Sequence, residues 1–281
     1  MKVGILINLK DDPYGRIGRA AKLGFSSGQI SVWNLSLYSE EGVQLVKKAC
    51  KDFNFTITAV WCGWSGPIEW GYPNMYTTLG LVPAAWRSQR VKELLDGAAF
   101  ARELGVKDII THLGYMPDNP MNEDRIGVVQ SVRHICKEIG KYGQRFLFET
   151  GEELPLTLVQ LMHETGMENV GVNFDPANLL INARANPADA LDLFASYVGG
   201  VHGKDGVYPQ GVNPKGKEVM IGSGRANFPV LIEKLVEAGY DGDITIEREI
   251  KDSEERDREI LEEKEYLENI IKEVMGRKGE K

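Results

Sequence analysis

The sequence has few cysteines and no long apolar run. Its 281 residues include only Cys50, Cys62 and Cys136, which are scattered and form no C-x-x-C pair. Three such thiols make no disulfide framework, so a reducing, cytoplasmic environment is expected. No segment approaches the roughly 18 apolar residues of a membrane span. The first residues, MKVGILINLKDD, pass from a short apolar run to charge without the cleavage pattern of a signal peptide. We therefore expect a soluble protein that is not exported.

An excess of basic residues is also missing. The chain has 41 Asp and Glu against 33 Lys and Arg, a formal net charge of −8. Such a charge repels a phosphate backbone unless a strong local basic patch compensates, so nucleic acid is not an expected partner. Much of the charge lies in the last thirty or so residues, among apolar residues at helical spacing. This pattern predicts a charged amphipathic helix at about 252–277, with an apolar face formed by Leu261, Tyr266, Leu267, Ile270, Ile271 and Val274.

Short β-branched runs alternate eight times with longer amphipathic segments. The expected strands are Val3 to Ile7, Gly28 to Trp33, Phe55 to Trp61, Asp108 to His112, Arg145 to Glu149, Val170 to Asp175, Val198 to His202 and Asp243 to Glu247. The clearest helical patterns are Ile17 to Leu23, Glu41 to Cys50, Arg87 to Leu104, Asp124 to Tyr142 and Phe228 to Ala238. Several helical patterns end at a glycine suited to a helix C-terminus: Gly24, Gly105, Gly143, Gly166 and Gly239.

This alternation requires a parallel sheet, because each connecting helix must cover one face of it. A doubly wound open sheet would also satisfy the pattern. However, eight units in about 250 residues match a closed barrel, and Ile7-Asn8-Leu9-Lys10 follows the first strand in place of a G-x-G-x-x-G motif. The sequence predicts one α/β domain over residues 1–281, a (β/α)8 TIM barrel.

The last five strands each end in a polar side chain that can bind a metal or a proton. These side chains are His112, Glu149, Asp175, His202 and Glu247. A closed sheet brings strand ends together around one axis, where the carboxylates would repel one another. One divalent cation relieves that repulsion, and mixed oxygen and nitrogen ligands suit manganese, cobalt or magnesium, with zinc as a further option. The simpler alternative is that each acid is solvated or caps the next helix.

Five segments resemble one known family in order along the chain. They are Phe148-Glu149-Thr150-Gly151-Glu152-Glu153, Asn173-Phe174-Asp175-Pro176-Ala177-Asn178, Val201-His202-Gly203-Lys204-Asp205-Gly206, Ile221-Gly222-Ser223-Gly224 and Ile246-Glu247-Arg248-Glu249. The chain is similar over nearly its whole length to the xylose isomerase-like barrels, the sugar phosphate isomerases and epimerases that include ketose 3-epimerases and hydroxypyruvate isomerases. The resemblance implies a small carbohydrate substrate and one metal ion, manganese first, held by Glu149, Asp175, His202 and Glu247. Members are often homodimers or homotetramers.

The resemblance also implies a chemistry, proton transfer alpha to a carbonyl through an enediolate. It assigns Glu149 and Glu247 as the catalytic base and acid, each also a metal ligand. The protein would then be a sugar epimerase or an aldose–ketose isomerase. Two departures concern the substrate: Asn178 stands where the family often has histidine, and Tyr208 where ketose 3-epimerases have arginine. Arg225 is the candidate replacement for that arginine.

Other substrate contacts are expected at Trp61, His112, Asn178 and Lys204. Each has a structural alternative: His112 can be a rim histidine, and Lys204 can pair with Asp205. The turn Gly222-Ser223-Gly224 can cradle a phosphate or simply be a tight turn. The long connection from Cys62 to Pro83 carries Trp64, Trp70, Tyr72 and Tyr76, which either cover a sugar ring or pack against neighbouring loops.

Three rival functions share this barrel. Apurinic endonucleases need further histidines and an aspartate for three metals, and neither Asn178 nor the loop after His202 supplies them. A noncatalytic barrel that senses a sugar or binds a partner is less expected, because both glutamates are present. A metal-dependent lyase or dehydratase acting on a keto-sugar or an inositol derivative begins with the same proton abstraction, and it is the main alternative among enzymes.

Overall fold

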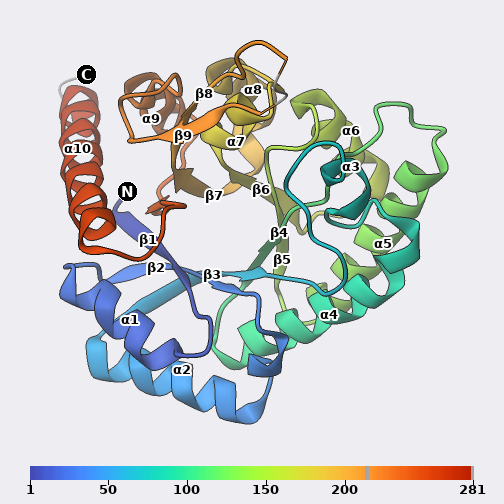
Figure 1. Cartoon of the computed structure of the whole chain (residues 1–281), viewed down its shortest axis with the longest axis horizontal. Helices are drawn as coiled ribbons and strands as arrows, with labels where there is room; N and C mark the ends of the chain where they lie inside the picture. Colours follow the sequence, from blue (N-terminus) through green and yellow to red (C-terminus); the bar gives the residue numbers. More distant parts are fainter. Residues whose placement is uncertain (213–214, 280–281) are drawn as a thin grey trace.

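Eight parallel strands close into a barrel in the computed structural model, which describes residues 1–212 and 215–279 (Figure 1). Their order around the barrel is β1-β10-β7-β6-β5-β4-β3-β2. The bounds are β1 Val3–Asn8, β2 Ser27–Val32, β3 Thr56–Cys62, β4 Asp108–Thr111, β5 Arg145–Glu149, β6 Val170–Phe174, β7 Val198–Gly203 and β10 Ile244–Ile246. The expected (β/α)8 TIM barrel is confirmed, with every strand end within one residue of its expected position.

Helices cover the outside of the barrel (Figure 1). They are α1 Pro13–Lys22, α2 Glu40–Phe53, α4 Ala84–Glu103, α5 Glu123–Gly140, α6 Pro155–Thr165, α7 Pro176–Ile181, α8 Pro187–Phe194 and α9 Phe228–Glu237. Four of these begin with proline, whose fixed φ suits the first helical turn. The five glycines expected at helix ends all have positive φ, between 62° and 84°. Local sequence therefore sets where these helices start and stop.

The charged C-terminal segment forms the long helix α10, Glu254–Gly279, beside β1, β10 and α9. Its inner face belongs to the main core: Ile260, Leu267, Ile270, Ile271 and Val274 are buried. The expected helix is therefore correct. The prediction that Leu261 belongs to the buried face is wrong, because Leu261 is 43% exposed and its neighbour Ile260 is buried in the core instead.

Some short elements on the rim were not expected. The Cys62 to Pro83 connection contains one helical turn, α3 Met75–Thr78, and the chain after β7 forms an antiparallel pair, β8 Asp205–Val207 with β9 Lys217–Val219. Elements of three or four residues are too short to show a periodicity in the sequence. None of the helices described is long and apolar enough to cross a membrane.

Candidate metal centre

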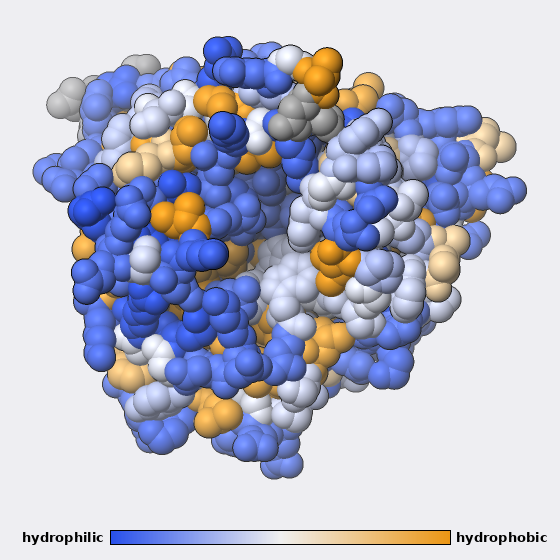
Figure 2. Space-filling view, viewed as in Figure 1, coloured by the Kyte–Doolittle hydropathy of each residue, from blue (hydrophilic) through white to orange (hydrophobic). Residues whose placement is uncertain are grey.

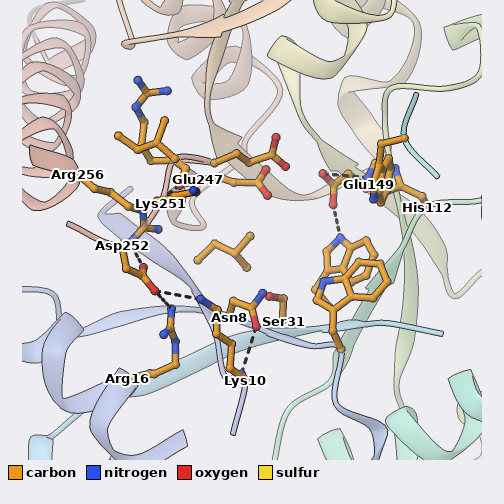
Figure 3. Close-up of a pocket in the computed structure, with 17 residues that line it drawn as sticks. Asn8, Lys10, Arg16, Ser31, His112, Glu149, Glu247, Lys251, Asp252 and Arg256 are labelled. Carbon is orange, nitrogen blue, oxygen red and sulfur yellow. Dashed lines mark hydrogen bonds and ion pairs between the residues drawn. The ribbon is translucent and has the colours of Figure 1, made fainter. Parts of the chain in front are cut away.

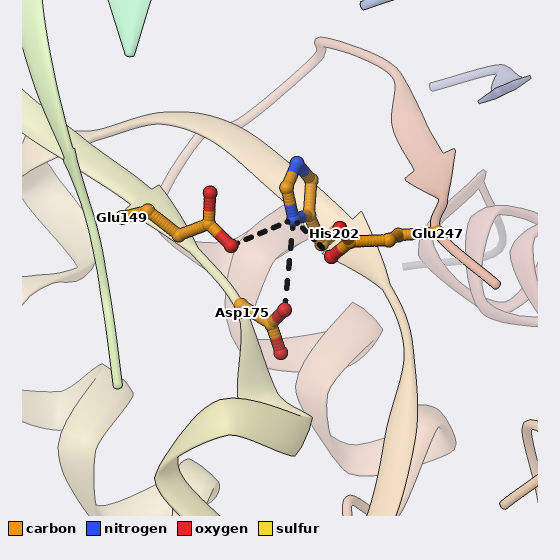
Figure 4. A group of neighbouring side chains, drawn as sticks. All are labelled: Glu149, Asp175, His202 and Glu247. Atoms are coloured by element: carbon orange, nitrogen blue, oxygen red, sulfur yellow. Dashed lines mark ion pairs between the residues drawn. The ribbon is translucent and has the colours of Figure 1, made fainter. Parts of the chain in front are cut away.

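Four side chains from neighbouring strand ends meet at one point inside the barrel mouth (Figure 4). Glu149 ends β5, Asp175 follows β6 and caps α7, His202 lies in β7, and Glu247 follows β10. One ligand atom of each lies within 4.8 Å of the others. The register explains this meeting, since Glu149 pairs with Asn173 and His202 with Thr245 on adjacent strands.

The imidazole of His202 is the centre of this group. Its Nδ1 lies 3.1 Å from Glu247 Oε2, 3.3 Å from Glu149 Oε1 and 3.6 Å from Asp175 Oδ2. Its other nitrogen, Nε2, lies 2.9 Å from Gln29 Oε1. Asn173 Nδ2 lies 3.1 Å from the same nitrogen. In the tautomer with the proton on Nε2, that N–H donates to the Gln29 amide oxygen and the lone pair of Nδ1 faces three carboxylates.

Two buried atoms of this cluster have no hydrogen-bond partner among the described residues, Asp175 Oδ2 and His202 Nδ1. Native interiors rarely leave such atoms unsatisfied, and an ion that is not drawn is a common reason. Three carboxylates and a neutral imidazole are a suitable ligand set for a divalent cation. These four residues can therefore hold a metal ion, as the sequence predicts.

The electrostatics of the site point the same way. Burial raises the pKa of Asp175 above its ordinary value. Burial lowers the pKa of His202, but the carboxylates of Glu149 and Glu247 outweigh it and raise that pKa well above the usual range. Burial also raises the pKa of Glu149 and Glu247, but nearby cations outweigh it and lower both, His202 for Glu149 and Lys204 with His202 for Glu247. The buried carboxylates therefore depend on positive charge close by, which a bound divalent cation would supply.

Lys204 supplies the positive charge next to the cluster. Its Nζ lies 3.0 Å from Glu247, 3.1 Å from Glu249 and 3.6 Å from Asp175, and the side chain is buried. Burial lowers the pKa of this ammonium, but Glu247 and Glu249 more than offset the effect and raise the pKa well above its ordinary value. Lys204 therefore stays charged and holds Glu247 in place.

Asp205 does not pair with Lys204. Its carboxylate instead binds backbone amides of the loop that follows β9. Its carboxylate accepts hydrogen bonds from the backbone N–H groups of Gly206, Gly222, Gly224 and Ala226 at 2.7 to 3.1 Å. The amide of Ser223 donates to Met220 O. The turn Gly222-Ser223-Gly224 thus has no free amide for a phosphate, and the phosphate interpretation of this turn is wrong.

Removing the Asp205 carboxylate should destabilise the protein strongly, because four amides lose their acceptor together. We expect Asp205→Ala to lower the free energy of unfolding by about 3 kcal/mol or more, and Tm by roughly 6 to 12 °C. Thermal denaturation followed by circular dichroism measures this. Asp192→Ala is the control, since Asp192 is exposed and, among the described residues, pairs with Lys234 alone; the Tm of this variant should change little. Equal effects of the two variants would contradict this role of Asp205.

A cavity of about 280 Å³ opens beside the cluster, at the hollow in the centre of the face in Figure 2. Glu149, Glu247 and His112 line it together with three tryptophans, Trp33, Trp61 and Trp70. The Trp61 indole N–H donates to Glu149 Oε2 (Figure 3). The ring centroids of Trp33 and Trp61 are 4.9 Å apart. An aromatic wall therefore adjoins Glu149 and borders a space of small-ligand size.

His112 lies at this wall between two acids. Its Nδ1 is 2.8 Å from Glu152 Oε2, and its Nε2 is 3.6 Å from Glu149 Oε1. Burial lowers the pKa of His112, but the carboxylates of Glu152 and Glu149 outweigh burial and raise it to about 10. The ring therefore lines the cavity with one nitrogen near each acid.

The other expected substrate contacts divide into two groups. Trp61 lines the cavity, while Asn178 and Lys204 touch the ligand set, Asn178 through a 3.1 Å hydrogen bond from Nδ2 to Glu149 Oε1. Arg225 is different: it is exposed, its backbone N–H bonds Gly206 O, and it does not belong to the residues that line the cavity. The expectation that Arg225 replaces the family arginine at the substrate has no support in this geometry.

Two residues that position the site were missed from the sequence. Gln29 and Asn173 lie in the middle of β2 and β6, are buried, and bond each other through Gln29 Nε2 and Asn173 Oδ1 at 3.0 Å. Gly200 lies in the neighbouring strand β7. A β-carbon at this position would lie only 2.3 Å from Asn173 Oδ1, so β7 needs glycine there. The sequence does contain a signal for both residues: each is an amide inside an otherwise apolar strand, and a buried amide requires a hydrogen-bond partner.

Gln29 fixes the ring of His202, so its loss should weaken metal binding. We expect Gln29→Leu to lower the affinity for a divalent metal by about 10- to 100-fold, measured by calorimetric titration. Gln144→Leu is the matched control: Gln144 is also buried, but it bonds Ala98 O and Val106 O away from the site. Affinity that falls equally in both variants would indicate general destabilisation and contradict a positioning role.

The family model of the xylose isomerase-like TIM barrels matches residues 17–270. The chain belongs to this family. Among its relatives, the uncharacterized protein MJ1311 of Methanocaldococcus jannaschii is 29% identical over 201 residues, which are 67% of this chain and 66% of that protein. The matched part is thus just under two thirds of that relative's length.

Solved structures share the whole fold. A xylose isomerase domain protein from Planctomyces limnophilus has a TM-score of 0.92 and 27% identity, covering 98% of both chains. A D-tagatose 3-epimerase-like protein has a TM-score of 0.78 and 21% identity over 99% of both chains. A family member from Mycobacterium smegmatis, solved in complex with magnesium, has a TM-score of 0.73 and 16% identity over 97% of both chains. The last two likenesses concern the fold alone.

Proposed function

We propose that this protein is a divalent-metal-dependent sugar isomerase or epimerase that moves a proton alpha to a carbonyl. The observation that carries the proposal is the pair of glutamates at the cavity, Glu149 and Glu247, which belong to the same four-residue cluster and also line the space for a ligand. Membership of the xylose isomerase-like family and the sugar epimerase-like neighbour support it.

Glu149, Asp175, His202 and Glu247 are the residues that would hold the ion, and manganese suits this oxygen-rich set best, with cobalt, magnesium and zinc as alternatives. When bound, a divalent metal supplies the positive charge that stabilises the negative charge of an enediolate. That charge is needed because a proton alpha to a carbonyl is scarcely acidic in water.

The two glutamates would share the proton transfer. Trp61 and Asn178 each donate a hydrogen bond to Glu149, and Lys204 donates one to Glu247, so both carboxylates are held in fixed orientations. One removes the proton as a base and the other returns one as an acid. Return to the opposite face of the same carbon gives the epimer, and return to the neighbouring carbon gives the aldose–ketose isomer.

The tryptophans and the remaining polar residues would bind the sugar. Trp33, Trp61 and Trp70 offer apolar faces to the C–H groups of a sugar ring, and His112 offers an N–H donor to one of its oxygens. These contacts fix the substrate relative to the glutamates, which is the geometric requirement for proton transfer.

The test is incorporation of deuterium from D2O into a panel of ketoses, keto-acids and their phosphates. The protein is stripped of metal and reconstituted with manganese, and products are analysed by NMR. Exchange into a product of altered configuration or carbonyl position is the expected result. Exchange that ends in loss of water would move the assignment to a dehydratase. No exchange across the panel, with metal demonstrably bound, would contradict the proposal.

A further inference from the structure

The side of the cavity away from His112 and Glu149 is basic (Figure 3). Lys10 follows β1 and Arg16 lies in α1. Lys251 lies in the segment that leads into α10, and Arg256 lies in the first turn of α10. All four line the same cavity as the two glutamates. We call these four residues the basic rim.

Three residues of the basic rim, Lys10, Arg16 and Arg256, share one carboxylate, that of Asp252. Lys10 Nζ and Arg16 Nη2 each lie 3.0 Å from Asp252 Oδ2, and Arg256 Nη1 lies 3.4 Å from Oδ1. Arg19 approaches the same group at 3.8 Å, although its closer partner is Asp257 at 2.8 Å. Positive charge therefore exceeds negative charge at this end of the cavity.

Lys251 adds to the excess. It is exposed at the cavity, and its ammonium has no ion-pair partner among residues 1–212 and 215–279. Nearby, Glu249 pairs with Lys204 at 3.1 Å, and Arg248 pairs with Glu259 at 2.8 Å and with Glu218. None of these ion pairs includes a residue of the basic rim.

The pKa values of Asp252 and Arg256 reflect the excess of positive charge at this end of the cavity. Burial raises the pKa of Asp252, but hydrogen bonds from Lys10 and Arg16 more than offset it and lower the pKa to about 2. Burial lowers the pKa of Arg256; Asp252 opposes that shift, and the cations Arg19 and Arg16 add to it. Mutual repulsion of this kind is relieved by an added anion.

We propose that the basic rim binds an anionic group of the substrate, a phosphate monoester or a carboxylate, at the end of the molecule away from the reacting carbonyl. The inference rests on the proposed function in placing the carbonyl at Glu149 and Glu247. Arginine and lysine donors form charge-assisted hydrogen bonds to such anions. The cavity of about 280 Å³ suits a short acidic sugar.

The competing explanation is that these ion pairs only tie the start of α10 to α1. The two explanations predict different effects of Asp252→Asn on anion binding. If an anion binds the basic rim, Asp252 competes with it for the same cations, so Asp252→Asn should strengthen anion binding. If the ion pairs are purely structural, the same substitution only loosens the segment, and anion binding does not improve.

The test is calorimetric titration of the magnesium-loaded full chain with sn-glycerol 3-phosphate, D-glycerate and glycerol. We expect at least one anion to bind ten times more tightly than glycerol, and the tighter of the two identifies phosphate or carboxylate as the natural group. Lys251→Ala should weaken that binding about tenfold, and Asp252→Asn should strengthen it several-fold. Lys92→Ala, an exposed lysine on α4 outside the cavity, is the control and should change nothing.

Lys251→Ala carries little risk for folding, because its side chain is exposed and makes no ion pair with the described residues. Anions that bind no more tightly than glycerol would overturn the proposal. Binding that is the same in wild type, Lys251→Ala and Asp252→Asn would also overturn it, because it would place the anion elsewhere, for example on the metal. Deuterium exchange is measured separately: its absence with intact anion binding would refute the proposed function alone.

Discussion

Replacing Glu247 with glutamine should lower the rate of deuterium exchange by about 10²- to 10⁴-fold with little change in KM. The substitution keeps the size of the side chain and one oxygen, but it removes the group that takes or returns the proton. An interaction needed only in the transition state affects kcat rather than binding. Initial rates in D2O at saturating metal, with the substrate identified from the panel, measure the effect. Glu149→Gln should give a loss of the same order.

Glu249→Gln is the matched control for this experiment. Glu249 contacts the same Lys204 ammonium, at 3.1 Å, but its side chain is 59% exposed and it is not part of the four-residue cluster. Its loss removes a similar charge at a similar place without removing a proton carrier. We expect its kcat to stay within about tenfold of wild type. Full turnover in Glu247→Gln would show that the two-glutamate mechanism is wrong.

Removing the metal should lower the thermal stability of the protein. A bound cation would offset three buried carboxylates, and a ligand present at about 100 times its Kd adds about 2.7 kcal/mol to the free energy of unfolding. For a chain of this size that corresponds to a fall in Tm of roughly 5 °C or more on chelation. Differential scanning fluorimetry after dialysis against EDTA measures the fall, and added manganese should restore the original Tm.

The His202→Ala variant separates this site from any other metal site. His202 offers the single nitrogen of the four-residue cluster and lies within 3.6 Å of three carboxylates. Without it, the Tm should no longer respond to EDTA or manganese. A Tm that responds equally in wild type and variant would place the stabilising metal elsewhere on the protein.

Much of the architecture could be predicted because it depends on local signals. The alternation of β-branched runs and amphipathic segments located the strands, and glycines such as Gly105 and Gly166 marked helix ends, where they adopt positive φ. The four-residue cluster could be predicted for a related reason. In a closed parallel barrel the strand ends converge, so residues that end successive strands lie close together in space.

The missed features depend on contacts between distant segments. Gln29 reaches His202 across 173 positions, and a strand periodicity says nothing of which strands face each other inside the barrel. The carboxylate of Asp205 occupies the amides of the Gly222 turn, a pairing that only the β8–β9 fold-back creates. Likewise, the basic rim joins Lys10 and Arg16 from the first βα unit with Lys251 from the last one, which only ring closure brings together.

We propose that Glu149, Asp175, His202 and Glu247 together bind one divalent metal ion. The most direct measurement is a crystal structure of the manganese-loaded protein with anomalous diffraction data collected near the manganese absorption edge. We expect one strong anomalous peak per chain, bonded to the three carboxylates and to Nδ1 of His202, with Nε2 still bonded to Gln29. An anomalous peak away from these four side chains, or none with manganese in excess, would contradict the account.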